Sequence, residues 1–349
     1  MRKYKIYVLL ANNRTLAATG GDKINEIRFY KALSIHFDVY YNGQLFKPND
    51  EDFGIVDKPI IIPEDIYDLY YVRANNYILA NCPRPKVAMA YPYSHWLYHH
   101  VDALIVTTSM WGNFIEQYNH NEEIKSLLLH WYKTPVIVEP KKIANIRQTI
   151  DPYFEQVFSE DEINAYKVQF GWSNIFGFFG SLAMQLIPWM ALEALKKLKN
   201  EIPSISIIAA GKKYSDTKLP NFVKTMNPID YEKMPIVLRA CSCLLANEGA
   251  ETEYLGSGKV LDAMACGVPI IAFKSAVRIE QLGDDYAGFY TAEEEVYDLI
   301  KMFITDKSFQ QLLKTQVLNR RELFNVKSQA EWIKEQLIPL VDESKNNLL

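Results

Sequence analysis

Residues 253–272 read EYLGSGKVLDAMACGVPIIA, a loop followed by a helix and then by a buried strand. The loop Gly256–Gly258 leads directly into a helix predicted over Lys259–Ala265. Gly267 ends that helix, and an apolar strand, Pro269–Phe273, follows at once. A helix joined to a buried strand by so short a turn indicates an α/β fold.

On either side of this stretch the chain alternates between apolar strands and helices. It opens with a strand Tyr4–Ala11, a loop Thr19–Asp22, a helix Lys23–Ser34 and a strand Phe37–Tyr41, an order typical of a doubly wound domain. The other predicted strands are 68–72, 86–90, 103–107, 135–139, 175–179, 205–210 and 243–246. The other predicted helices are 109–118, 189–198, 231–240, 293–305, 308–319 and 329–341.

The pattern changes near residues 151–158, where a polar, helical stretch begins. We therefore predict an α/β fold of two Rossmann-like doubly wound domains that face a cleft, residues 1–170 and 171–327. Residues 328–349 are predicted to form a helix that packs back on the first domain. That helix carries an apolar stripe of Trp332, Ile333, Leu337 and Val341.

The amino-acid composition limits the classes of protein to which the chain can belong. The chain has 349 residues, 49% hydrophobic and 23% charged, which fits two globular domains. Its net charge of -4 gives no reason to expect a nucleic-acid partner. The four cysteines form no CxxC pair, and no apolar run is long enough for a spanning helix. We expect a cytoplasmic protein, with peripheral contact to a membrane left open.

The start of the predicted helix at Lys259 is suited to an anion. Free backbone N–H groups and the helix dipole attract phosphate at such a position, and Lys259 adds a full positive charge. Asp262 lies three residues later, within reach of a ribose diol. The loop is not a Walker motif, because Val260 stands where Ser or Thr would hold Mg²⁺. A solvated loop before an amphipathic helix is the equal alternative.

The same segment resembles the donor-binding signature of GT-B glycosyltransferases of the group 1 type. In that family a lysine and an acidic residue precede a helix end and a Gly-x-Pro-Val-Ile run. The resemblance implies that Lys259 contacts the donor diphosphate and that Asp262 binds the ribose. The family's second glutamate falls at Tyr254, one residue from Glu253, so the identity of the second acid and the stereochemical outcome stay open.

The resemblance covers most of the chain in the family's order and implies further site residues. It places the donor on the second domain and the acceptor on the first. Arg73, at a strand end, and His95, in an aromatic segment, are catalytic candidates beside Lys259, although an ion pair or packing would equally explain them. The donor-binding candidates are Gly180, Ser181, Lys213, Asn227, Gly256, Ser257, Gly258, Lys259, Asp262 and Glu280, and the candidates in a cleft loop are Gly20, Gly21 and Asp22.

The sequence thus predicts a glycosyltransferase that moves a sugar from a nucleotide-sugar donor to a glycan, lipid-linked or other hydroxyl acceptor. We expect no metal or other cofactor, since Asp50-Glu51-Asp52 and Asp284-Asp285 are interpreted as solvated turns rather than as a metal site. The alternatives are a nucleotide-sugar epimerase or phosphorylase of the same architecture, and a non-catalytic nucleotide-sugar-binding protein.

Overall fold

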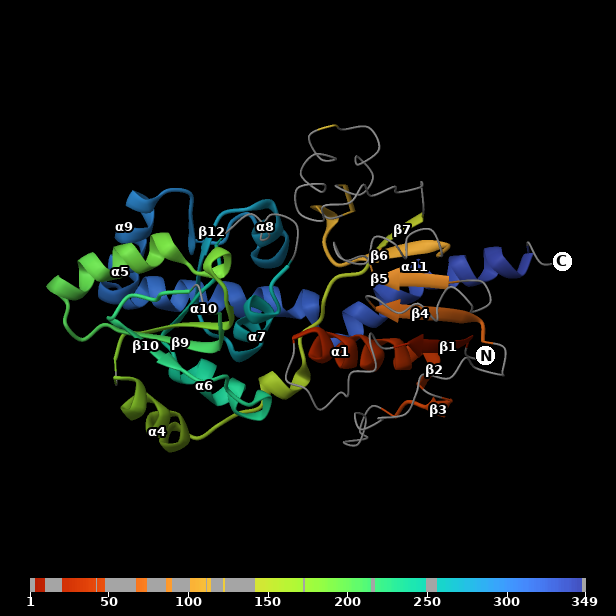
Figure 1. The fold of residues 1–349 in the computed structure, drawn as a ribbon, viewed down its shortest axis with the longest axis horizontal. Coiled ribbons are helices and arrows are strands. Elements are labelled where there is room, and N and C mark those ends of the chain that lie inside the picture. Colours follow the sequence, from red (N-terminus) through yellow and green to blue (C-terminus); the bar gives the residue numbers. More distant parts are fainter. Residues whose placement is uncertain are drawn as a thin grey trace. The chain divides into compact units, whose positions relative to one another are not determined.

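The computed structural model divides the chain into two compact units (Figure 1). Unit 1 comprises Met1–Thr149 with Val326–Leu349, and unit 2 comprises Ile150–Asn325. Each unit is built on one sheet. The structure describes residues 4–9, 21–41, 43–47, 67–73, 86–89, 101–110, 112–113, 122, 142–171, 173–214, 217–248 and 256–346.

Unit 1 holds a seven-stranded sheet in the order β3-β2-β1-β4-β5-β6-β7. Its strands are parallel except for the β2–β3 pair. Strand order reverses between β1 and β4, as in other doubly wound sheets. The strands are β1 (Tyr4–Leu9), β2 (Phe37–Tyr41), β3 (Gln44–Leu45), β4 (Leu69–Arg73), β5 (Lys86–Met89), β6 (Ala103–Val106) and β7 (Lys142–Asn145).

Among the described residues of unit 1, two long helices come from opposite ends of the sequence. Helix α1 (Gly21–His36) follows β1, and helix α11 (Val326–Asn346) returns from unit 2. Ile333 and Leu337 of α11 are buried in the same core as Phe29 of α1. The Tyr4 hydroxyl donates to Asp342 at 2.6 Å, so β1 and α11 are also joined at the surface.

Unit 2 holds six strands in the order β10-β9-β8-β11-β12-β13, all parallel. Its strands are β8 (Ile175–Leu182), β9 (Ser206–Lys213), β10 (Val223–Met226), β11 (Cys243–Leu245), β12 (Ile270–Phe273) and β13 (Phe289–Tyr290). The helices are α4 (Glu160–Phe170), α5 (Trp189–Glu201), α6 (Met234–Ala240), α7 (Gly258–Cys266), α8 (Ala276–Leu282), α9 (Glu293–Thr305) and α10 (Lys307–Arg321). Figure 1 shows α5 and α9 on one side of this sheet and α4 and α6 on the other. The predicted Rossmann-like sheets are confirmed.

The boundary between the units differs from the predicted one. The sequence placed it at residue 170, whereas the structure places it at Thr149 and Ile150. Ile150 and Phe154 are buried in the core of unit 2, and α4 packs against α6. Residues 150–170 therefore belong to unit 2. The boundary was misplaced because most of these residues are polar, and the few apolar side chains that pack into the core do not stand out in the composition.

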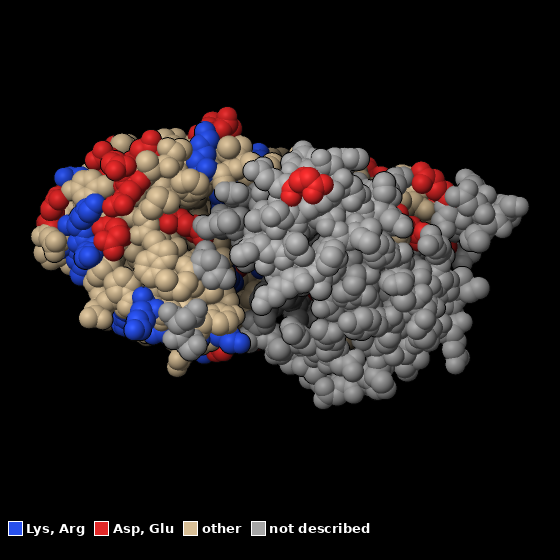
Figure 2. All heavy atoms as spheres, turned by 45° about the horizontal axis from the view of Figure 1, so that its top comes forward, with Lys and Arg blue, Asp and Glu red and all other residues tan. Residues whose placement is uncertain are grey.

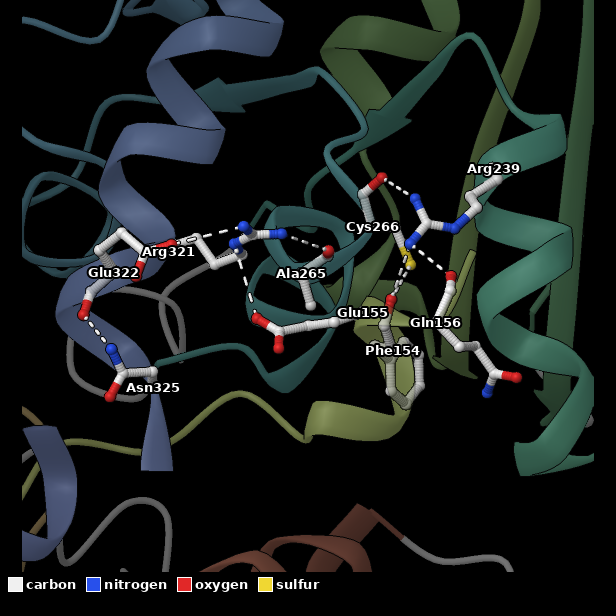
Figure 3. A network of polar contacts seen from close by, with 9 residues as sticks. All are labelled: Phe154, Glu155, Gln156, Arg239, Ala265, Cys266, Arg321, Glu322 and Asn325. Carbon is white, nitrogen blue, oxygen red and sulfur yellow. Dashed lines mark hydrogen bonds and ion pairs between the residues drawn. The ribbon is translucent and has the colours of Figure 1, made fainter. Parts of the chain in front are cut away.

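Two arginines fix the first and last segments of unit 2 to the end of α7 (Figure 3). Arg239 donates to the carbonyls of Cys266, Phe154 and Gln156. Arg321 donates to the carbonyl of Ala265 and pairs with Glu155 at 3.6 Å. A cation at the C-terminus of a helix is favoured by the helix dipole. The carboxyl end of α7 thus holds the chain where it enters unit 2.

Some predicted elements changed or lie outside the description. The helix predicted over 231–240 begins as a 3-10 turn, Tyr231–Lys233, and becomes α6 only at Met234, next to Pro235, a residue suited to a helix start. Strands β3, β7, β10 and β13 and helix α8 were not predicted. The strand predicted over 135–139 lies outside the described residues.

Candidate functional site

The strand order of unit 2 reverses between β8 and β11, which neighbour each other in the sheet. Connections from these two strands leave toward opposite faces, and ligands of doubly wound folds bind at the carboxyl ends of such strands. Helix α5 follows β8, and helix α7 lies between β11 and β12 in the sequence. The starts of α5 and α7 are therefore the two helix N-termini that this strand order makes candidates for binding an anion.

The carboxyl ends of β8 and β9 are paired through two glycines, Gly180 and Gly211. The two strands were predicted to end at residues 179 and 210, but both continue as paired strand to Leu182 and Lys213. Gly180 has a φ of 113°, and a Cβ atom on Gly211 would lie 1.6 Å from the Gly180 carbonyl oxygen. Glycine at these two positions therefore lets the paired strands continue past their predicted ends.

Helix α7 begins without a side-chain cap. Ser257 is its N-cap residue, and the hydroxyl of Ser257 makes no capping hydrogen bond. Gly267 ends the helix in the left-handed region at a φ of 65°, as the sequence predicted. An uncapped helix start presents backbone N–H groups and a partial positive charge, which suit a phosphate group.

Lys259 and Asp262 form an ion pair on the first turn of α7. Lys259 Nζ lies 3.2 Å from Asp262 Oδ2. The Asp262 side chain is 3% exposed and that of Lys259 is 31% exposed, so the carboxylate is buried and the ammonium reaches solvent. A Cβ atom on Gly180 would lie 3.8 Å from Lys259 Cε, which places the end of β8 beside this lysine. The structure thus brings Gly180, Lys259 and Asp262 together.

The start of α5 is occupied by the protein's own carboxylate. Its N-cap residue, Pro188, has no capping side chain. Glu248, three residues beyond β11, accepts hydrogen bonds from the amides of Met190 at 3.0 Å and Ala191 at 3.4 Å, and from the Tyr290 hydroxyl. A side-chain oxygen in this position satisfies the amides that a helix start leaves free. At the start of α7, by contrast, the structure describes no carboxylate that accepts from the first amides of the helix, and Ser257 does not cap it.

Glu248 gives a pH-dependent prediction. Burial raises the pKa of its carboxyl, against the opposing effect of its hydrogen bonds. Since the folded pKa lies above the unfolded value, the contribution of Glu248 to stability is largest below about pH 4.3 and falls as pH rises through the folded pKa. Glu248→Gln, which keeps an acceptor but does not titrate, should remove this component. Urea unfolding of both proteins from about pH 4 to pH 8 measures this component. Stability curves that stay parallel over that range would contradict the assignment.

A buried polar cluster on α8 lies against the start of α7. Arg278, 1% exposed, donates to Gln281 Oε1 at 2.6 Å and to Asn247 Oδ1 at 2.9 Å. Gln281 in turn donates to the Ser257 carbonyl at 3.1 Å and accepts from the Ser257 amide at 3.4 Å. Burial lowers the pKa of the Arg278 guanidinium to about 10, so it stays charged at neutral pH.

The other predicted donor-binding residues lie on the same unit. Gly256, Ser257 and Gly258 lead into α7 as predicted. The Ser181 hydroxyl lies 3.2 Å from the Tyr214 hydroxyl, and Lys213 ends β9 with an exposed side chain. Asn227 follows β10 and is exposed, and Glu280 is half-buried on α8, where its carbonyl accepts from Arg320.

The candidates of the first domain lie on unit 1 or outside the description. Arg73 ends β4, and Gly21 and Asp22 begin α1 rather than forming a turn. Gly20 and His95 lie outside the described residues. Four buried residues at the site were not predicted, because nothing in their local sequence distinguishes them from packing residues: Glu248, Arg278, Gln281 and Tyr290.

The distribution of charged side chains and of possible metal ligands does not point to a second site among the described residues. Figure 2 shows side chains of both signs intermingled over the described part of unit 2 on the face drawn. Within the described ranges, no three His, Cys, Asp or Glu side chains gather as a metal site would require. No helix in that part of the chain is long and apolar enough to span a membrane.

Solved structures share this fold over nearly the whole chain. HepE from Anabaena, in complex with UDP-glucose, superimposes with a TM-score of 0.65 at 16% identity, covering 97% of this chain and 100% of HepE. Sucrose-phosphate synthase from Thermosynechococcus elongatus gives 0.65 at 13% identity, covering 98% and 100%. A glycosyltransferase from Rickettsia africae gives 0.59 at 14% identity, covering 97% and 100%. No curated protein sequence matches significantly.

Two Rossmann-like units with a candidate anion site at a helix start in the second define the GT-B class of fold. Residues 161–317 match the family model described as Glycosyl transferases group 1, a range within unit 2 that includes α7. Most of unit 2 therefore matches the group 1 glycosyltransferase family, as the resemblance implied.

Proposed function

We propose that this protein transfers a glycosyl group from a nucleoside diphosphate sugar to a hydroxyl acceptor. The observation that carries the proposal is the start of α7. It lies at the carboxyl edge of a unit that matches the group 1 glycosyltransferase family, has no side-chain cap, and carries Lys259 beside a buried aspartate. The equivalent start of α5 is filled by Glu248, so the diphosphate is assigned to α7.

The chemistry follows from charge at that position. In the transfer the bond between the anomeric carbon and the diphosphate oxygen breaks, the acceptor oxygen forms the new bond, and the acceptor proton leaves to a base. Lys259 and the first amides of α7 would stabilise the negative charge that develops on the leaving diphosphate. Asp262 would bind the ribose, with Gly180, Ser181, Lys213, Asn227 and Glu280 around the donor. Arg73 and His95 remain candidates on unit 1 for the acceptor side.

The donor is first tested as a uridine nucleotide. HepE was solved with UDP-glucose and a pneumococcal O-GlcNAc transferase, GtfA, with UDP and GlcNAc. Calorimetric titration with UDP, GDP, ADP, dTDP and CDP, followed by incubation with the matching labelled sugars and a panel of glycan and lipid-linked acceptors, identifies donor and acceptor together. Labelled sugar on an acceptor supports the proposal; an epimerised donor, or binding without turnover, would support the epimerase or the binding protein instead.

We further propose that transfer needs no metal ion. Lys259 and the α7 amides supply positive charge where Mn²⁺ or Mg²⁺ acts in other diphosphate sites. The expected result is an unchanged rate of transfer in excess EDTA, measured with the donor identified above. Loss of activity in EDTA and recovery with Mn²⁺ would show that the diphosphate charge is neutralised differently.

A further inference from the structure

We propose that Gln281 and Arg278 of α8 are positioning residues that fix the start of α7 in the geometry needed to bind the donor diphosphate. The proposal rests on the function proposed above for α7. Neither side chain is assigned to the donor in this scheme; both are buried, Arg278 at 1% exposure and Gln281 at 4%, and both are engaged with groups of the protein itself. They act through the backbone of Ser257.

The side-chain amide of Gln281 holds both polar backbone groups of Ser257. Its Nε2 donates to the Ser257 carbonyl at 3.1 Å, and its Oε1 accepts from the Ser257 amide at 3.4 Å. Ser257 is the N-cap residue of α7, yet its own hydroxyl does not set the helix start. The conformation that most helices obtain from a capping side chain therefore comes here from the neighbouring helix α8.

Arg278 fixes Gln281 and joins it to a second strand end. One guanidinium nitrogen donates to Gln281 Oε1 at 2.6 Å and the other to Asn247 Oδ1 at 2.9 Å. Asn247 follows β11, so the pair ties the exit of β11 to the start of α7. Both partners of the guanidinium are neutral amides, so its positive charge also favours an anion at the nearby helix start.

Helix α8 is itself held in place. The Ser275 hydroxyl accepts from the Arg278 amide at 3.3 Å at its start. At its end, Arg320 of α10 donates to the carbonyls of Gln281 at 3.1 Å and Glu280 at 2.7 Å. The amide of Gln281 thus projects from a fixed helix, which is what a positioning residue requires.

The test compares two glutamines that make the same kind of contact. Gln316 on α10 accepts from the Ala287 amide at 3.0 Å and donates to the Asp285 carbonyl at 2.9 Å, on a loop that leads to β13. Gln281→Ala and Gln316→Ala therefore each remove one amide that holds a backbone segment. The measurements are hydrogen exchange of peptides covering 256–264 in the free protein, and titration with UDP and with inorganic diphosphate.

Gln281→Ala should exchange roughly tenfold faster over 256–264, because two hydrogen bonds to Ser257 are lost. Its affinity for UDP should fall roughly tenfold, while Gln316→Ala matches the wild type in both measurements. Arg278→Lys keeps the charge but loses the two-pronged contact, so it should also loosen 256–264. If Gln281→Ala exchanges at the wild-type rate over 256–264, the proposal is overturned. If Arg278→Lys does so, Arg278 has no positioning role.

The two proposals fail in different ways. If the wild type binds no nucleoside diphosphate, the proposed function fails, while the exchange measurement still decides whether Gln281 fixes the helix start. If the wild type binds UDP and Gln281→Ala binds it equally well, the proposed function stands and the positioning role of Gln281 falls.

Discussion

Lys259→Ala should reduce the rate of sugar transfer about a hundred- to a thousandfold. A single preorganised electrostatic contact to charge that develops in the transition state contributes roughly 2.7–4 kcal/mol when it lies in a closed site. Lys259 carries the full positive charge on the first turn of α7, next to the uncapped amides. The measurement is kcat and KM for the donor identified by the panel.

The same change should cost some stability. Lys259 pairs at 3.2 Å with Asp262, whose side chain is 3% exposed, so its removal takes one partner from a buried carboxylate. Removing one partner of a buried polar group lowers the free energy of unfolding by about 1–3 kcal/mol. The loss for Lys259→Ala should be at the lower end of that range, because solvent reaches the lysine. Lys301→Ala is the matched control, since Lys301 pairs at 3.1 Å with Glu201 on the surface of the same unit. Activity of Lys259→Ala equal to that of Lys301→Ala would make Lys259 a structural residue.

Asp262→Asn separates binding from chemistry. A ribose contact exists equally in the ground and transition states, so its loss should raise KM far more than it lowers kcat. Lys259→Ala should instead lower kcat, because in the proposed mechanism the interaction of Lys259 with the diphosphate grows as the diphosphate leaves. The same kinetic experiment on both variants distinguishes the two roles. A fall in kcat alone for Asp262→Asn would place the carboxylate at the reacting centre.

The sequence was informative wherever function and local structure depend on neighbouring residues. The segment 253–272 contains the helix start, its left-handed end at Gly267 and the following strand, and helical periodicity locates α7 and β12 within a residue. The Lys259–Asp262 pair follows from a spacing of one helical turn. These features are encoded within twenty residues and needed no tertiary contact to be predicted.

The features that were not predicted depend on contacts between distant segments. Glu248 caps a helix that begins nearly sixty residues earlier, and Gln281 holds a serine 24 residues before it. Neither residue belongs to a local pattern, because any glutamate or glutamine on a surface helix or loop looks the same in the sequence. Gly211 was left outside the predicted strand 205–210 for the same reason: its partner is Gly180 on another strand.

Gly211→Ala should therefore be among the most damaging single substitutions in unit 2. The new Cβ would lie 1.6 Å from the Gly180 carbonyl oxygen and 2.7 Å from its carbonyl carbon. Both are backbone atoms of the neighbouring strand, so no rotamer change relieves the clash and the ends of β8 and β9 must separate. Overpacking against backbone at this level costs about 3 kcal/mol or more. Because Gly180 lies beside Lys259, sugar transfer should fall with stability.

Two other glycines separate this clash from the cost of an unusual backbone conformation. Gly180 has a φ of 113°, but a Cβ there would meet only Lys259 Cε at 3.8 Å, and Gly43 has a φ of 77° with nothing within 4 Å. Gly180→Ala and Gly43→Ala should therefore show strain alone, about 1–3 kcal/mol each. Calorimetry gives the melting temperature of each of the three variants, and Gly211→Ala should have the lowest. If Gly211→Ala melts with or above the other two, the strand ends are not as closely paired as the structure shows, and the position of Lys259 beside β8 has to be reconsidered.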